Sequence, residues 1–593
     1  MLYSAGMEGE RRPIVGARGT RVAVALVVGA GLLASIPLIA TGIPPGHDAT
    51  LHLKWSTHFT KQLWAGDPFP RWLYGMNAGF GSPTFFYYGP VPYYITSALR
   101  RVIPGDDVGW RALGLSAALA LIVSGVGALA WLARRAGRAT PAATLAAIAY
   151  VLLPYHLVID VYARAAFGEL WAFAWLPWVL LGVEEVARGA RSARAAQAPL
   201  AALAVAYAFL VATHLPTTLF ATPVLLALPF AVAPAGAPPG ARGGAGERVS
   251  TGTRLGAGAR VAAALALGAA LAAIYLLPAL SMQDAVRIEH APTSHKFYAN
   301  NFLFDRGGNR PFAEFLTRVG GLTAATYAVA AVALVAGASR ERPFWFAIAT
   351  ISVLMMLPVS RPIWAAIPSL QTIQFPWRFN VVLALAVTAL LAGAGAEQDP
   401  RGRAFRGGRL LAALSALAIA ACLFALLGAS RQSARERRAL NAALVGTEVA
   451  LGMENPDYRP RWARIEMFAG APLDALTAPR GARVTLGPGS VRVAQLGPRA
   501  ILLESDAPGT SEIVVDQFYF PGWRARMKDG TRATIETFPA EPWGLLGLRV
   551  PPGRHAIALR PTAGVPGAIG AVVSAAAAAA ILALALSGRR AVR

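Results

Sequence analysis

The stretch "VGWRALGLSAALALIVSGVGALAWLA", residues 108–133, contains a single charged residue, Arg111. As an α-helix, such a run is long enough to cross a hydrocarbon core of about 30 Å. The chain as a whole has the same character, because its 593 residues are 55% hydrophobic and only 15% charged. A soluble protein has about 25% charged residues. The composition therefore predicts a polytopic α-helical membrane protein.

Twelve apolar runs are predicted to span the membrane. They are residues 22–40, 108–133, 141–157, 170–186, 197–213, 217–233, 259–280, 319–337, 343–358, 376–394, 409–429 and 565–587. The first run follows several arginines without a small-residue cleavage site, which is typical of an uncleaved signal anchor. The single cysteine, Cys422, lies inside an apolar run, so no disulfide framework is predicted.

The connections between the runs predict one orientation. With residues 1–21 inside, every cytoplasmic connection is basic, as the positive-inside rule requires. These connections are "RRAGR" (134–138), "EEVARGARSAR" (184–194), the linker 234–260, "SRER" (339–342), "DPRGRAFRGGR" (399–409) and the tail "GRRAVR" (588–593). They carry more than half of the net charge of +24, so this charge does not require a nucleic-acid partner. We therefore predict a plasma-membrane (inner-membrane) protein with both termini in the cytoplasm.

The domain organisation follows from the same pattern. Residues 22–429 form a transmembrane domain with a long first external loop, 41–107, which is rich in aromatic residues typical of a membrane interface. Residues 430–563 hold short alternating runs separated by Gly/Pro turns, which predict an extracytoplasmic antiparallel β-sandwich of roughly jelly-roll type. Residues 564–593 form the last span and the tail. In the β-domain, "FYFPGWRARMKDG" (518–530) is interpreted as core and turn, rather than as a sugar-binding face.

An acidic residue near the start of the first external loop is the first candidate for chemistry. In "GHDATLHLKW" (46–55), a helix beginning at Asp48 would place Asp48, His52 and Trp55 on one face. Asp48 is a good N-cap residue, and it is equally a candidate base. Both roles stay open, because a cap leaves one carboxylate oxygen unused.

Further polar residues gather at the predicted external ends of the spans, where their cost in a membrane marks them as functional candidates. Arg164 and Glu169 could form an ion pair, or Arg164 could face an anionic head group. His214 could be a packed residue or a ligand. Arg378 lies near the start of a span, where a helix dipole and an arginine fork suit a phosphate, although it could instead extend to the interface.

Several motifs resemble known families. Asp48, "VYARAAFGELWAFAWLPWVLL" (161–181), "THLPTTLF" (213–220) and "IQFPWRFN" (373–380) resemble the bacterial 6-pyruvoyl-tetrahydropterin-synthase-related membrane proteins. "DQFYFPGWRARMKDG" (516–530) and "VPPGRHAIALRP" (550–561) resemble the closing strands of the YfhO-like membrane proteins. Both families are similar in layout to the GT-C glycosyltransferases.

The resemblance implies an inverting glycosyltransferase with Asp48 as the catalytic base. It implies a polyprenyl-phosphate sugar donor bound through Arg378 and Arg164. His47, His52, Glu169, His214 and Trp377 are then candidates for substrate binding. Many GT-C enzymes carry paired acidic residues where this chain has His47 and Asp48, so no cofactor is firmly implied and the need for a divalent metal stays open.

The leading hypothesis is a glycosyltransferase, embedded in the lipid bilayer, that acts at the outer face of the membrane on an envelope polysaccharide or glycolipid acceptor. Two alternatives remain: a transporter or flippase for a lipid-linked sugar, and a non-catalytic envelope scaffold. A transporter predicts polar residues in mid-span and a cytoplasmic access site. A scaffold would tolerate the loss of Asp48.

Overall fold

The structure is a computed structural model that describes most of the chain. The described residues are 17–104, 108–137, 139–189, 196–232, 251–287, 294–305, 307, 312–337, 339–394, 456–468, 478–528 and 533–589. The predicted span 409–429, with Cys422, and the predicted basic connection 399–409 lie outside these residues.

Helices lie at the other eleven predicted spans. The helices are α1 (Ala17–Ala34), α2 (Ile36–Thr41), α3 (Ala49–Trp64), α4 (Thr84–Tyr87), α5 (Val91–Arg100), α6 (Val108–Ala136), α7 (Pro141–Leu152), the π-helix η1 (Tyr155–Arg164), α8 (Phe167–Arg188), α9 (Gln197–Val211), α10 (Leu215–Ala231), α11 (Thr251–Leu271), α12 (Ala273–Ser281), α13 (Ala313–Ala336), α14 (Arg342–Met356), α15 (Arg361–Ala366), α16 (Pro368–Gln371), α17 (Asn380–Ala394) and α21 (Gly564–Arg589). Short 3₁₀ turns are η2 (Gln283–Ala285), η3 (Tyr298–Asn300), η4 (Pro358–Ser360), η5 (Pro376–Phe379), η6 (Pro456–Tyr458) and η7 (Ile465–Phe468). Within the described residues, seven helices are long and apolar enough to cross a membrane, or eight if the bent pair at 342–366 is one span.

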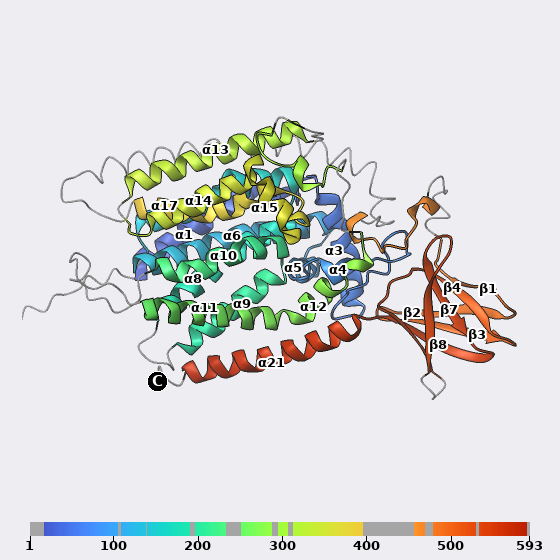
Figure 1. Cartoon of the computed structure of the whole chain (residues 1–593). Helices are drawn as coiled ribbons and strands as arrows, with labels where there is room; N and C mark the ends of the chain where they lie inside the picture. The colour runs from blue at the N-terminus through green and yellow to red at the C-terminus, as the bar shows by residue number, and fades with distance from the viewer. Residues whose placement is uncertain are drawn as a thin grey trace, which may run out of the picture.

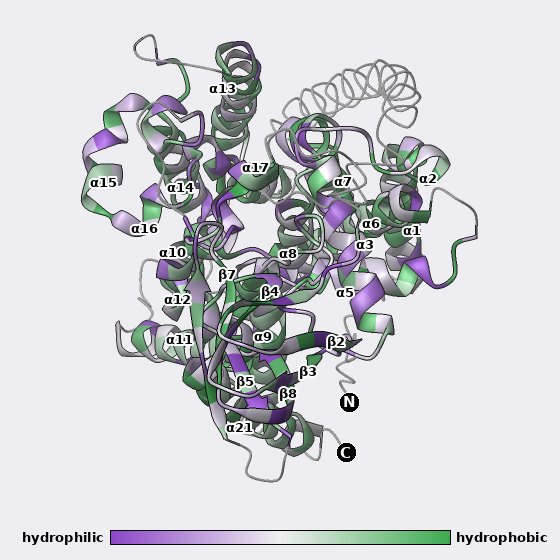
Figure 2. Ribbon diagram, turned by 90° about the vertical axis from the view of Figure 1, so that its right-hand side faces the viewer, coloured by the Kyte–Doolittle hydropathy of each residue, from purple (hydrophilic) through white to green (hydrophobic). Residues whose placement is uncertain are grey.

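The helices run side by side, and the sheet lies beyond one end of them (Figure 1). Viewed from that end, α8 lies in the middle of the helices (Figure 2). Within its most apolar stretch of 18 residues, 78% is buried. The last helix, α21, runs from the sheet back along the outside of the bundle to the C-terminus (Figure 1). Only 17% of its most apolar stretch of 18 residues is buried. Most of the apolar surface of α21 therefore does not contact the rest of the protein, which is typical of a helix that contacts lipid.

The ends of the helices far from the sheet carry the basic connections. Near the end of α6, Arg135 lies 2.9 Å from Glu184 Oε1 in α8 and pairs with Glu341, which precedes α14. Arg134 lies 3.4 Å from Glu185. Three of the connections predicted to be cytoplasmic thus meet at a single end of the molecule.

The C-terminal domain is an antiparallel sheet of eight strands. They are β1 (Ala482–Leu486), β2 (Ser490–Leu496), β3 (Ile501–Ala507), β4 (Ser511–Phe518), β5 (Trp523–Met527), β6 (Thr534–Ala540), β7 (Leu545–Val550) and β8 (Gly553–Pro561), in the spatial order β1-β4-β7-β6-β5-β8-β3-β2. Two residue pairs between β5 and β6 join its two four-stranded halves. Alternate residues of both halves, such as Leu503, Ile513 and Leu548, share one hydrophobic core.

Two features correct the predicted β-sandwich. Its two layers are one continuous sheet, because β5 and β6 pair directly. The order also differs from a jelly roll, in which the first and last strands are neighbours, since β1 pairs with β4 here. Trp523 is 1% exposed and packs against Trp72 with ring centroids 5.3 Å apart, which agrees with its interpretation as a core residue.

The aromatic part of the first loop packs against the sheet. Trp72 Nε1 donates a hydrogen bond to Gln517 Oε1 (2.9 Å), and Phe518 N donates one to Phe80 O (2.7 Å). Phe80 and Phe86 are at most 5% exposed and belong to the core of the sheet domain. For Phe80 and Phe86 the prediction of an interfacial aromatic belt is therefore wrong, because their rings bury their apolar surface in the sheet domain. Phe85 and Tyr93 of the same stretch are buried among helical residues instead.

Candidate active site

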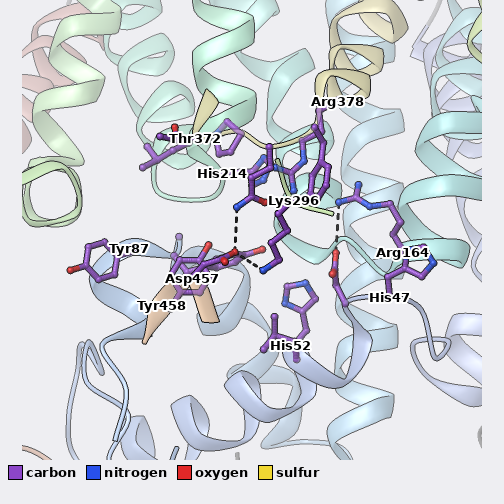
Figure 3. A pocket seen from close by; sticks show the side chains of 18 of the residues that line it. His47, His52, Tyr87, Arg164, His214, Lys296, Thr372, Arg378, Asp457 and Tyr458 are labelled. Carbon is purple, nitrogen blue, oxygen red and sulfur yellow. Dashed lines mark hydrogen bonds and ion pairs between the residues drawn. The ribbon is translucent and has the colours of Figure 1, made fainter. Parts of the chain in front are cut away.

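A cavity of about 480 Å³ is lined by residues of α3, α4 and η5, among others (Figure 3). In Figure 1, α3 and α4 lie at the end of the helices that faces the sheet. Segments far apart in the sequence line it: residues 47–55, 87–89, 164, 213–216, 295–301, 372–378 and 457–458. Seven of the eight residues singled out from the sequence are among them, namely His47, Asp48, His52, Arg164, His214, Trp377 and Arg378. The eighth, Glu169, lies behind Arg164, and its side chain is 1% exposed.

Asp48 occupies the N-cap position of α3, but its side chain makes no capping hydrogen bond. The carboxylate is 39% exposed at the cavity, and its Oδ2 lies 3.7 Å from Arg164 Nη2. The capping role that the sequence left open is therefore not the role of this carboxylate in the structure. Its oxygens are available to the cavity.

The backbone fixes Asp48 against Arg164. Asp48 N donates a hydrogen bond to Arg164 O (2.8 Å), and His47 N donates one to Ala163 O (3.3 Å). A Cβ on Gly46 would lie 2.6 Å from Arg164 C, so only glycine permits this approach. The chain turns at this point because Ala165, with φ 55°, ends η1 in the left-handed region.

Arg164 is buried and surrounded by carboxylates. It is 4% exposed, and its Nη1 lies 2.7 Å from Asp160 Oδ1 and 2.9 Å from Glu169 Oε2. Its guanidinium also lies over the Trp377 ring, 4.6 Å from the centroid. Asp160 lies one turn earlier in η1, and its Oδ2 has no hydrogen-bond partner among the described residues. Arg164 thus faces three carboxylates, with Asp48 as the most distant and most exposed of them.

Arg378 lies in the 3₁₀ turn η5, which leads directly into α17. Its Nη1 donates to Ile373 O (2.9 Å), and its Nε lies 3.5 Å from Glu169 Oε2. No described residue binds its Nη2, although the side chain lines the cavity and is 15% exposed. Arg378 therefore keeps donor capacity that a ligand in the cavity can use.

The three histidines differ in their surroundings. His47 is exposed and stacks on Phe312, with centroids 6.0 Å apart. His52 is 2% exposed, its Nδ1 lies 2.7 Å from the Tyr93 hydroxyl, and its Nε2 accepts from Phe167 N (3.4 Å). His214 is 8% exposed and binds Thr217 Oγ1 through Nδ1 (2.8 Å). Burial lowers the pKa of His52 to about 4 and that of His214 to about 3, so both are neutral at pH 7.

Neutral His52 predicts a pH dependence of stability. Its pKa is about 4 when folded and 6.5 when unfolded, so the unfolded state takes up the proton first as the pH falls. The resulting stability is complete above pH 6.5 and declines toward pH 4, by about 2 kcal/mol between pH 7 and pH 5. We expect His52→Gln to flatten this decline relative to the unmodified protein, measured by thermal unfolding at a series of pH values. An unchanged decline would show that His52 ionises in the folded state.

Three charged residues that line the cavity, Lys54, Lys296 and Asp457, are not predicted as site residues from the sequence. Lys296 Nζ lies 2.7 Å from Asp457 Oδ2, and Gln374 Nε2 donates to the same oxygen (3.3 Å). Asp457 belongs to the stretch assigned to the β-domain, and nothing in its local pattern points to the cavity. Lys296 did carry a signal, since it is one of only four lysines among 55 Lys and Arg residues.

The arrangement offers no evident metal centre. Across the part of the chain that the structure describes, no three His, Cys, Asp or Glu side chains are placed to hold a metal ion. The partner of Asp48 is the cation Arg164 rather than a second carboxylate.

Fold and cavity define a class: a membrane protein whose apolar helices enclose a polar cavity at the end that carries a C-terminal antiparallel sheet. The chain belongs to the 6-pyruvoyl-tetrahydropterin synthase related family of membrane proteins, whose sequence model matches residues 85–435. That range includes Arg164, Glu169, His214, Lys296 and Arg378. Asp48 and Asp457 lie outside it.

Solved structures give weak similarities. The arabinofuranosyltransferase AftD from Mycobacteria is 19% identical with a TM-score of 0.44, over 70% of this chain and 27% of that one. The oligosaccharyltransferase AglB from Archaeoglobus fulgidus is 14% identical with a TM-score of 0.42, over 75% of this chain and 61% of that one. The chain thus spans about a quarter of the first and three fifths of the second, and no role is assigned from either likeness. No curated protein matches the sequence.

Proposed function

We propose that this protein is an integral membrane glycosyltransferase that uses a polyprenyl-phosphate sugar at the outer face of the membrane and inverts the anomeric centre. An envelope polysaccharide or glycolipid is the acceptor. The observation that carries the proposal is the carboxylate of Asp48, which makes no capping hydrogen bond to α3 and faces the cavity beside the buried cation Arg164. A carboxylate in such a position can accept a proton from a bound hydroxyl.

The proposed step balances in charge and atoms. Asp48 takes the proton of the acceptor hydroxyl while that oxygen forms a bond to the anomeric carbon of the donor. The bond from the anomeric carbon to the phosphate oxygen breaks, and its electron pair leaves with the polyprenyl phosphate. Negative charge grows on the leaving phosphate, so the unused N–H donors of Arg378 would stabilise the transition state more than the ground state.

The outward orientation is supported by the separation of charge along the molecule. The basic connections of α6, α8 and α14 meet at the end far from the sheet, which the positive-inside rule assigns to the cytoplasm. The cavity lies at the opposite end, next to the sheet (Figure 1). A donor held in the bilayer would enter such a cavity from the side, with its apolar chain between the helices.

The proposal is tested with the full-length protein reconstituted in lipid vesicles. A panel of polyprenyl-phosphate sugars is supplied with envelope extract, and release of polyprenyl phosphate and incorporation of labelled sugar are measured together. We expect both in equal amounts, with inverted configuration in the product. Movement of intact donor across the vesicle membrane without release of phosphate would establish a transporter instead, and glycan binding with neither would establish a scaffold.

A further inference from the structure

The cavity contains a second ion pair that the proposed reaction does not use. Lys296 Nζ and Asp457 Oδ2 are 2.7 Å apart, and their side chains are 16% and 8% exposed. Both residues line the cavity, and Figure 3 shows the contact as a dashed line. Burying an ion pair costs solvation free energy, and the attraction between the charges offsets this cost only when the geometry is good. Such a pair at a cavity is therefore weak evidence for a role in stability alone.

Hydrogen bonds from neighbouring amide side chains hold both residues of the pair in place. Asn301 Nδ2 donates to His295 O (2.7 Å) and Phe297 O (2.9 Å), which fixes the backbone on both sides of Lys296. Gln374, which donates to the Asp457 carboxylate, has φ 72°, a region that non-glycine residues rarely adopt. Strained backbone of this kind persists where the surroundings impose it, often at ligand sites.

Arg164 is poorly suited to the donor phosphate by comparison. Its guanidinium already faces Asp160, Glu169 and Asp48, so one cation is surrounded by three carboxylates. A phosphate brought to Arg164 would meet their repulsion. It would also lie on the same side of the anomeric carbon as the base, whereas an inverting displacement needs the nucleophile and the leaving group on opposite sides.

We propose that Lys296 is a second cation that receives the donor phosphate, in addition to Arg378, and that Asp457 is an internal anion which occupies Lys296 until the phosphate displaces it. This inference rests on the proposed function. An ammonium group has three donors and binds phosphate as a point charge. The donor phosphodiester carries one negative charge and the released phosphate nearly two, so the exchange with the single charge of Asp457 becomes more favourable as the reaction proceeds.

The segment that carries Asp457 is also fixed by its neighbours. Asp457 lies in η6, and Arg461, four residues further on, donates its backbone N–H to Ala285 O (2.9 Å). Tyr458 beside it packs on Trp55 with ring centroids 5.6 Å apart.

The test is equilibrium binding to the full-length protein in lipid nanodiscs. The probes are a fluorescent short-chain polyprenyl phosphate and the matching polyprenyl alcohol. We expect Lys296→Gln to weaken phosphate binding and Asp457→Asn to tighten it, each about tenfold, the scale of one hydrogen bond to a charged group. Alcohol binding should change in neither variant. Lys61→Gln, an exposed lysine of α3 that does not line the cavity, is the matched control.

The outcomes separate this inference from the proposed function. If the unmodified protein binds phosphate no better than alcohol, the proposed donor class fails. If it prefers phosphate and Lys296→Gln keeps that preference, or Asp457→Asn weakens binding, the inference alone is overturned. The double variant Lys296→Gln/Asp457→Asn removes both charges without leaving one buried and unpaired, and it should bind phosphate more weakly than Asp457→Asn, because the cation is gone; equal binding by these two variants would overturn the inference.

Discussion

Asp48→Asn is expected to lower the rate of sugar transfer by between about 10²- and 10⁴-fold, the usual contribution of a positioned general base. The side chain keeps its size, but an amide cannot accept the proton of the acceptor hydroxyl. Since Asp48 makes no capping hydrogen bond, α3 should begin at the same residue. The measurement is single-turnover transfer in lipid vesicles, with donor at saturation.

The control is Asp506→Asn in β3, whose carboxylate is 52% exposed and pairs with Arg554 at 2.7 Å. The same chemical change there should leave the rate within twofold of the unmodified protein, because the residue is remote from the cavity. Binding of the polyprenyl phosphate probe to Asp48→Asn should also persist. Full activity of Asp48→Asn would refute its role as the base.

Arg164→Met is expected to destabilise the folded protein by about 3–5 kcal/mol, the cost of removing one partner from a buried ionic group. Asp160 and Glu169 would remain at most 2% exposed. Arg378 Nε, 3.5 Å from Glu169, would then be the nearest remaining cation to that carboxylate among the described residues. The measurement is unfolding of purified protein in mixed detergent and denaturant, followed by tryptophan fluorescence.

Arg318→Met on α13 is the matched control. Arg318 also pairs with a carboxylate, Glu314, but the two side chains are 71% and 81% exposed, and exposed pairs contribute about 0–1 kcal/mol. Adding Asp160→Asn and Glu169→Gln to Arg164→Met should recover most of the stability, since neutral groups no longer repel one another. A loss for Arg164→Met no greater than for Arg318→Met would show that the buried network does not stabilise the fold.

The residues around Arg164 show how far the sequence could predict the site. Arg164 and Glu169 are five residues apart in the sequence, which permits the ion pair that the structure shows. The sequence equally allows Arg164 to face an anionic head group. The sequence does not predict that Asp160 contacts Arg164, because the expected helix 141–157 ends before both residues. The π-helix that follows α7, and the left-handed Ala165 that ends it, bring these groups together.

Local pattern alone determined much of this protein. Runs of apolar residues predicted the helices, and alternation predicted antiparallel strands. Polar residues at the external ends of the predicted spans identified five side chains of the cavity, and the family resemblance added His47 and Trp377. These features depend on each residue's own preference for water or apolar surroundings, repeated at the period of a helix or a strand, so they can be found without knowing what packs on what.

Tertiary structure decided which charges meet. Lys296 and Asp457 are 161 residues apart and pair only because the chain entering the sheet returns to the cavity. Phe80 and Phe86 of the first loop likewise pack in the core of the sheet domain instead of at a lipid interface. Such contacts are absent from local pattern, because the energy of a buried charge or ring depends on partners that only the packed fold supplies.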